Sequence, residues 1–302
     1  MLGGGIAAVS LLGFFDDRFW LAELATSVRA HLLLGSLVLG ALALLVRSIA
    51  GAGLAAIALT ANAVVLVPLY TDEPAPPVGS GRLLIAHVNM QHHYGDFDDV
   101  RRVLVDRKPA VLVVLEPSRG WLDKTSPNPA GYRVFVRGAR PEPRILLLAG
   151  ERVSNVAFPD DPELPSSSIA FIVELGDALV HVLALHTAAP TTPGSRTTRN
   201  DELAAVSSWA RRQVNPELVL GDLNATPWAS VLQGLEDSAD LRSSAYGYGV
   251  QATWPSRAGP FGIPIDQLLH SRDLTVTGRT TGPSFGSEHG SLWVTIARSD
   301  SE

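Results

Sequence analysis

The apolar residues of this 302-residue chain are distributed differently before and after about residue 70. Before it, three apolar stretches follow one another, at Leu2 to Phe15, Leu32 to Val46 and Ile49 to Tyr70. The third is long enough to cross the hydrocarbon core of a bilayer, about 30 Å thick, as a helix. The first two are shorter, and each needs flanking residues to span. This pattern predicts a membrane anchor of two to three helices in residues 1–70.

The first stretch also fits a cleaved signal peptide, although it lacks a basic amino-terminal region and a clear small-residue cleavage site. A buried helical hairpin is a further alternative for this region. Arg47 lies in the tight link between the second and third stretches, and the positive-inside rule places it in the cytoplasm. We therefore predict a multi-pass protein of the cell membrane, whose larger part lies on the extracytoplasmic side. This orientation depends on one arginine.

Residues 71–81 read TDEPAPPVGSG, and this proline- and glycine-rich composition predicts a linker. From residue 82 to 302, apolar runs of strand length recur, and most are continuous, as in strands covered on both faces of a sheet. The runs are Leu83–Val88, Val111–Leu115, Ile145–Leu148, Ile169–Val173, Leu179–Leu185, Leu218–Leu220, Gln267–Leu269 and Leu292–Ile296. The pattern predicts one α/β domain with layered sheets over residues 82–302.

Helical spacing occurs between some of these runs. Asp98 to Lys108 places its apolar residues on one side. Thr197 to Val214 does the same, with arginines on the opposite face. Both segments are expected to be helices that cover a sheet.

Composition and charge narrow the function classes. The net charge of −6 argues against strong nonspecific binding to nucleic acid, although a local basic groove stays open. The chain has no cysteine, which excludes disulfides, zinc–thiolate sites and thiol nucleophiles. The absence of cysteine fits an oxidising compartment as well as a reducing one.

Polar side chains stand at the ends of the predicted strands. They are Asn89, Glu116, His186, Asp222 and Asn224, which follow apolar runs, and Asp266 and His289, which precede them. In a mixed sheet, an antiparallel strand starts at the edge where its neighbours end, so these groups are expected to meet at one rim. A buried carboxylate costs several kcal/mol unless it is paired or bound to a cation. The cluster therefore predicts a metal site.

Each of these residues alone also fits a structural role. Asp222 or Asn224 can cap a helix that begins near Pro227. Glu116 can be a solvated strand end, and either histidine can be a hydrogen-bonded structural residue. Their recurrence at strand ends, in this order, favours a shared site.

In that order, the motifs resemble those of the endonuclease/exonuclease/phosphatase superfamily, in its bacterial branch with an N-terminal membrane anchor. The motifs are HVNMQ, VVLEP, ALHTAAP, GDLNATPW, PIDQLL and SEHGSLWV. The resemblance covers residues 82–302 and implies a four-layer αββα sandwich, in which helices flank two packed mixed sheets. It also implies a phosphoric ester hydrolase that depends on Mg²⁺, with Mn²⁺ as an alternative ion.

The resemblance implies a set of metal ligands. Glu116 resembles the principal carboxylate ligand, Asn89 helps to fix the metal or phosphate, and Glu288 is a further ligand. Oxygen ligands of this kind suit a hard divalent cation. Three positions depart from the family pattern. Glu288 stands where Asp is usual, Gln91 where some members carry an acid, and Gln267 where His or Tyr is common.

The resemblance also implies catalytic roles. Asp222 and Asn224 resemble the pair that aligns the attacking water and holds a phosphoryl oxygen. Asp266 and His289 resemble the dyad whose imidazole handles a proton or stabilises phosphorane charge. His186 is expected to contact the phosphate near the leaving group, so that Asn224 and His186 also bind substrate.

Together these features predict a membrane-anchored phosphoesterase that hydrolyses phosphodiester or phosphomonoester bonds. Its partners are the lipid bilayer and a phosphorylated substrate, which can be a nucleic acid, a phospholipid or an inositol phosphate. The departures at Glu288 and Gln91 motivate an alternative. In that alternative the domain is degenerate and non-catalytic, and it binds a phosphorylated ligand or a protein partner at the membrane.

Overall fold

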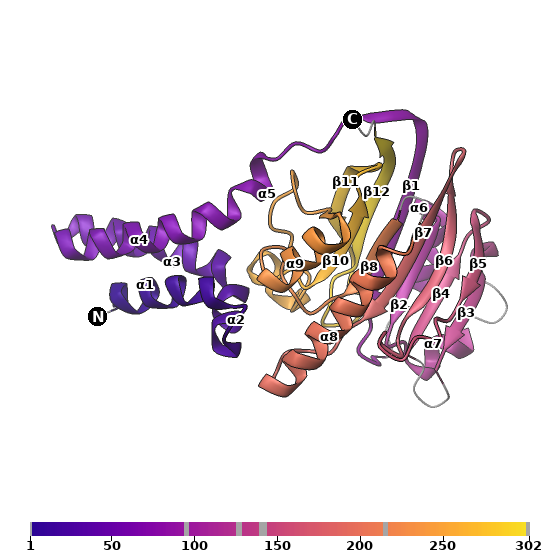
Figure 1. Ribbon diagram of the computed structural model, residues 1–302, viewed down its shortest axis with the longest axis horizontal. Helices are drawn as coiled ribbons and strands as arrows, with labels where there is room; N and C mark the ends of the chain where they lie inside the picture. The colour runs from indigo at the N-terminus through magenta and orange to yellow at the C-terminus, as the bar shows by residue number, and fades with distance from the viewer. Residues whose placement is uncertain (1, 94–96, 125–128, 139–143, 214–216, 300–302) are drawn as a thin grey trace.

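A computed structural model describes residues 2–93, 97–124, 129–138, 144–213 and 217–299. In these ranges twelve strands form two six-stranded mixed sheets that pack face to face (Figure 1). Helices cover the outer face of each sheet, and a separate group of helices precedes the first strand. The sequence predicts a layered α/β fold, and the two mixed sheets flanked by helices confirm it.

The first sheet has the strand order β11-β12-β1-β2-β4-β3. Its strands are β1 (Pro77–Asn89), β2 (Val111–Leu115), β3 (Arg133–Arg137), β4 (Ile145–Ala149), β11 (Leu274–Thr281) and β12 (Leu292–Ser299). Only the central pair β1 and β2 is parallel among these described strands, and the other neighbours are antiparallel.

The second sheet has the order β5-β6-β7-β8-β10-β9. Its strands are β5 (Val153–Ala157), β6 (Ile169–Leu175), β7 (Ala178–His186), β8 (Glu217–Asp222), β9 (Leu241–Ser243) and β10 (Asp266–Ser271). The central strands β7 and β8 are parallel, and β10 runs antiparallel to β8. Each sheet therefore has a parallel pair at its centre.

Three apolar layers hold the sandwich together. The inner faces of both sheets form one buried core. On the outside, α6 (Phe97–Arg107) and α7 (Arg119–Lys124) pack on the first sheet. The second sheet is covered by α8 (Pro193–Ala210) and α9 (Ser230–Ala239). Because both faces of the central strands are buried, their sequences are continuously apolar.

All eight apolar runs expected as strands lie in strands. The remaining strands, β3, β5, β9 and β11, were not expected from the sequence, and each lies at an edge of its sheet. The segment expected as a linker, residues 71–81, is strand in its second half, because β1 already begins at Pro77 and pairs there with β12.

The expected helix Thr197 to Val214 is α8, which begins earlier, at Pro193. A capping box between Thr192 and Ser195 fixes this start. The arginines of this helix were expected opposite its apolar face, but Arg199 is fully buried. Val214 lies outside the described residues.

The N-terminal group contains a 3₁₀ helix at Gly13–Phe15 and five described α-helices: α1 (Leu2–Leu12), α2 (Trp20–Ser27), α3 (Arg29–Leu45), α4 (Ile49–Leu66) and α5 (Pro68–Thr71). In the described part of the chain, α4 is long and apolar enough to cross a membrane. The pair α2 and α3, which is bent by 65°, gives a second candidate if it counts as one span. The 11 residues of α1 rise only about 16 Å. One or two candidate spans therefore stand where two to three were expected.

Candidate active site

The carboxyl ends of the central strands of both sheets meet at one rim of the sandwich. Asn89 ends β1, and Glu116 directly follows β2, its parallel neighbour. In the second sheet, Asp222 is the direct cross-strand partner of both His186 and Asp266. The strand register thus brings five of the expected residues to the same edge, as the sequence pattern implied.

A hydrogen bond joins the two sheets at this rim. The side-chain amide of Asn89 donates to Asp222 Oδ2 at 2.9 Å, and both side chains are buried. The carbonyl of Asn89 accepts from the Ser287 hydroxyl, which in turn accepts the backbone N–H of His289 at 3.0 Å. Asn89 therefore fixes the relative positions of Asp222 and the turn that carries His289.

Asp266 lies between two imidazoles. His289 Nδ1 is 2.8 Å from Asp266 Oδ2, and His87 Nε2 is 3.3 Å from Asp266 Oδ1, with all three side chains buried. Burial opposes ionisation of Asp266, but the two imidazoles outweigh it and hold the pKa of Asp266 well below its usual value. Sequence reasoning missed His87. His87 could have been predicted from its position two residues before Asn89, because residues two apart in a strand lie on the same face.

Asp222, Asp266 and His289 each offer a donor atom, and these atoms lie within 4.8 Å of one another. Burial and the neighbouring charge of Asp266 raise the pKa of Asp222. Two buried carboxylates so close together repel each other, and a nearby cation removes that cost. The oxygen-rich donor set, together with the amide of Asn89, fits a hard divalent ion such as Mg²⁺.

His186 connects Glu116 to Asp222. His186 Nδ1 is 3.4 Å from Glu116 Oε1, and its Nε2 is 3.5 Å from Asp222 Oδ2. Burial alone would lower the pKa of His186, but the hydrogen bond to Glu116 and the neighbouring carboxylates raise it to about 9. The same hydrogen bond lowers the pKa of Glu116. The imidazole therefore separates two carboxylates and favours the charged form of each partner.

Asn224 faces the same groups. Its side-chain amide donates to the carbonyl of Thr187 at 3.0 Å and lies 3.3 Å from His186 Nε2. Its backbone N–H donates to Asp222 Oδ1 at 3.1 Å. Asn224 thus connects the loop after β7 to the loop after β8.

The backbone at the rim adopts uncommon conformations. Gly221 has a φ of +143°, and a Cβ there would lie 1.8 Å from the carbonyl oxygen of Leu185. Glu116 and Asn224 have φ values of +46° and +48°, in the left-handed region. Asn tolerates this region better than most residues, whereas Glu rarely occupies it. Such conformations concentrate at functional sites.

Glu288 is the candidate that does not join this group. Its carboxylate pairs with Arg257 Nη1 at 2.9 Å, and its side chain is 40% exposed. Gln91 has a φ of +46° and contributes a backbone N–H to Asn89 Oδ1 at 3.0 Å. The other expected site residues all contact one another directly or through a shared neighbour.

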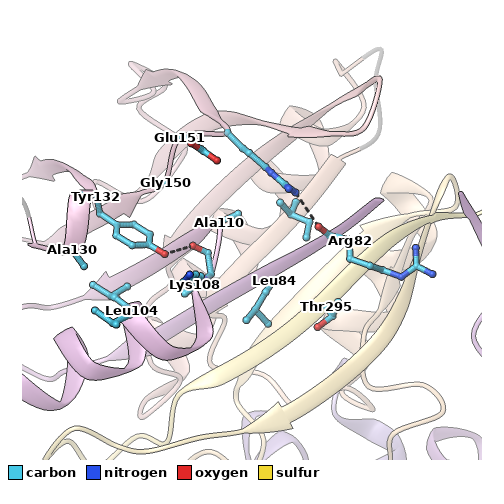
Figure 2. Close-up of a pocket in the computed structure, with 15 residues that line it drawn as sticks. Arg82, Leu84, Leu104, Lys108, Ala110, Ala130, Tyr132, Gly150, Glu151 and Thr295 are labelled. Carbon is cyan, nitrogen blue, oxygen red and sulfur yellow. Dashed lines mark hydrogen bonds between the residues drawn. The ribbon is translucent and has the colours of Figure 1, made fainter. Parts of the chain in front are cut away.

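A pocket of about 770 Å³ lies at the opposite end of the first sheet (Figure 2). It is lined by residues from the middle of β1, from the link between α6 and β2, and from the end of β4, including Arg82, Leu84, Lys108, Tyr132 and Glu151. It contains none of the candidate site residues. The candidate site therefore lies at the other end of the sheet, outside this pocket.

The comparison with protein families decides the classification. The model of the endonuclease/exonuclease/phosphatase family matches residues 86–289. The chain belongs to this family. The match begins within β1 and ends at His289, so it includes every candidate site residue. Nuclease and phosphatase members of the family support a phosphoric ester hydrolase.

Solved structures of the family share the fold at low sequence identity. Humanized TDP2 from D. rerio is 15% identical, with a TM-score of 0.58, over 72% of this chain and 99% of that chain. The 3′-5′ exonuclease NExo from Neisseria meningitidis is 18% identical, with a TM-score of 0.58, over 72% and 100%. The endonuclease/exonuclease/phosphatase from Beutenbergia cavernae is 14% identical, with a TM-score of 0.57, over 73% and 72%. No curated protein matches the sequence significantly.

Proposed function

We propose that this protein is a membrane-anchored phosphoesterase that depends on a divalent metal ion and hydrolyses phosphodiester or phosphomonoester bonds. The observation that carries the proposal is the convergence of both sheets on one set of donors, in which Asn89 of the first sheet binds Asp222 of the second. Family membership supports the reaction class.

The metal ion, Mg²⁺ or Mn²⁺, would be held by Glu116 and Asn89, with Asp222 of the donor cluster as the neighbouring carboxylate. Asp266 and His289 of that cluster pair with each other and are therefore assigned to proton handling. When bound, the metal ion supplies a Lewis acid that polarises a phosphoryl oxygen and neutralises developing charge. Glu288 is a less suitable ligand than the sequence suggested, since it already pairs with Arg257. The metal set therefore rests on residues of the central strands.

The protein's own groups would handle the proton and orient the reactants. Asp266 accepts from His289 Nδ1, which fixes the ring and leaves Nε2 on the side of Asp222, 3.8 Å from its Oδ2. Asp222 and Asn224 would orient a water molecule and a phosphoryl oxygen. His186, which lies between Glu116 and Asp222, would contact the phosphate and stabilise its negative charge.

The membrane anchor is supported by the surface of the N-terminal helices. Of the 27 exposed large apolar side chains in the described residues, 22 lie between Val9 and Tyr70. An apolar surface of this extent is typical of a lipid or protein contact. Helix α4 supplies a span of sufficient length. With Arg47 in the cytoplasm, the catalytic domain lies on the extracytoplasmic side.

Two substrate classes have support. TDP2 from D. rerio was solved with a single-strand DNA product, and NExo with a product DNA hairpin. Nucleic acid is therefore one candidate substrate. The anchor favours a second class, phospholipids or other lipid-linked phosphates, because it holds the site beside a bilayer.

The test is a substrate panel with the purified full-length chain. DNA, inositol phosphates and phospholipid vesicles are offered with Mg²⁺ or Mn²⁺, and the His289→Ala variant serves as the blank. We expect phosphate release or diester cleavage that EDTA abolishes. Metal binding without turnover on any substrate would favour the non-catalytic alternative. Protection of the large domain from protease added to intact cells would contradict the proposed orientation.

A further inference from the structure

The loop that follows Asp222 is held by the N-terminal helical segment as well as by its own domain. The indole N–H of Trp228 donates to the carbonyl of Thr26 at 2.7 Å, and this bond is buried. The backbone N–H of Ser230, the first residue of α9, donates to Asp16 Oδ2 at 3.0 Å. Asp16 thereby caps α9 from more than 200 residues away.

One face of α2 contacts both loops of the candidate site. Trp20, Glu23 and Thr26 recur every third residue and so lie on the same side of the helix. The indole N–H of Trp20 donates to the carbonyl of Pro190 at 2.8 Å, in the loop that follows His186. Figure 1 shows α2 on the side of the domain where α8 lies. Helix α2 therefore packs directly against the loops that follow β7 and β8.

The centre of this contact is a buried ion pair. Glu23 and Arg199 are 4% and 0% exposed, and their side chains bond directly. Arg196, one turn earlier on α8, donates from Nε to the other oxygen of Glu23 at 2.6 Å. An arginine left unpaired in such a position is costly. The carboxylate of Glu23 offsets the cost of burying the charged guanidinium of Arg199.

Arg199 also binds the backbone of the site. Its Nη1 donates to the carbonyl oxygen of Asn224 at 2.8 Å. Asn224 is the residue with φ of +48°, so its peptide plane needs an external partner to keep that orientation. A continuous chain of contacts thus runs from Glu23 through Arg199 to Asn224, and from Asn224 to Asp222.

We propose that Glu23 is a positioning residue of the active site: through Arg199 it sets the geometry of the loop that carries Asp222 and Asn224. The N-terminal helical segment is then part of the catalytic unit as well as an anchor. This inference rests on the proposed phosphoesterase function. An ion pair that only attached the helices to the domain would affect stability and leave turnover of the folded protein unchanged.

The experiment compares Glu23→Gln with Asp17→Asn in the full-length chain. Asp17 is a matched control, since its side chain is 57% exposed and pairs with Arg18 at 3.7 Å. For bis(p-nitrophenyl) phosphate, we expect Glu23→Gln to lower kcat at least about tenfold with KM within about twofold, because misplacement of reacting groups acts on turnover. The control is expected to keep both values. Arg199→Lys, which retains the charge and loses the planar fork, should resemble Glu23→Gln.

Hydrogen–deuterium exchange gives a readout that does not need activity. Glu23→Gln and Arg199→Lys should accelerate exchange in residues 222–230, whereas Asp17→Asn should not. If the wild-type protein hydrolyses no ester, the proposed function fails, and the exchange data still decide whether Glu23 orders this loop. Unchanged exchange in both variants, or wild-type kcat in a folded Glu23→Gln protein, would overturn the inference.

Discussion

The side-chain amide of Asn89 donates to Asp222 Oδ2 across a distance of 2.9 Å, and this bond connects the two sheets at the rim where their central strands end. Asn89 is the last residue of β1 and Asp222 the last of β8. Because both side chains are buried, neither can be satisfied by bulk water. The sandwich therefore brings residues that lie more than 130 positions apart into one polar centre.

Asp266 orients His289 by accepting a hydrogen bond from its Nδ1 atom. Asp266→Asn should lower kcat by about 10²- to 10⁴-fold, since the imidazole loses the carboxylate that fixes its orientation. The carboxylates of Asp266 and Asp222 overcome burial and raise the pKa of His289, so the limb of the pH–rate profile due to His289 should move to lower pH. Steady-state kinetics from pH 5 to 9 measure both effects. A variant with wild-type kcat would exclude the dyad.

Glu116 and Glu288, the two acidic candidates outside the cluster of Asp222, Asp266 and His289, should differ in their effect on turnover. Glu116→Gln should reduce turnover about 100-fold or more, because Glu116 shares His186 with Asp222. Glu288→Gln should reduce it less than about fivefold, because that carboxylate pairs with the exposed Arg257. Parallel assays of the two amide variants at saturating Mg²⁺ check this order. Equal losses would mean that Glu288 leaves Arg257 to bind metal.

Gly221 should tolerate no side chain. Gly221→Ala places a Cβ against the carbonyl oxygen of Leu185 in the neighbouring strand, and that backbone cannot move aside without breaking the β7–β8 pairing. We expect a loss of stability of about 3 kcal/mol or more. Thermal unfolding followed by circular dichroism measures it. Gly234→Ala is the control, since its added Cβ meets open space on α9. Equal melting temperatures for both variants would contradict the prediction.

Glu236 on α9 should make stability depend on pH. Burial raises its pKa from 4.5 to about 7, and Oε2 accepts one backbone N–H, from Ser243. Because the folded state holds the proton more tightly than the unfolded state, its contribution is full below about pH 4.5. The contribution is lost as pH rises through 7, and it amounts to about 3 kcal/mol at the most. The Tm of Glu236→Gln relative to wild type should therefore be higher at pH 8 than at pH 5. The same difference at both pH values would show that Glu236 does not titrate in this range.

The central strands could be predicted from the sequence because strands buried on both faces consist of continuous apolar runs. The four edge strands could not. In β3, the sequence RVFVR places arginines at both ends, and no residue of the strand is fully buried. Edge strands expose a row of backbone groups, and charged side chains there discourage pairing with other chains. Their sequences therefore lack the apolar run that marks a strand.

The site residues that stand at strand ends could be predicted from the sequence. The residues whose burial or pairing depends on a partner far away in the sequence could not. Arg199 looks like a solvent-facing helix residue until Glu23, 176 positions away, is placed beside it. His87 looks like an interruption of an apolar run until Asp266 is placed opposite. Glu288 resembles a metal ligand in its motif, but Arg257 draws its carboxylate outward. Each difference comes from a tertiary contact that local sequence does not encode.

The most direct test of the central claim is Mn²⁺ binding to the full-length protein, measured by electron paramagnetic resonance of the free ion. We expect one Mn²⁺ per chain, displaced by Mg²⁺, with affinity reduced at least about tenfold in both Glu116→Gln and Asp222→Asn. Because Glu116 follows a strand of the first sheet and Asp222 ends a strand of the second, a loss in both variants requires a shared centre. Binding that neither substitution weakens would contradict it.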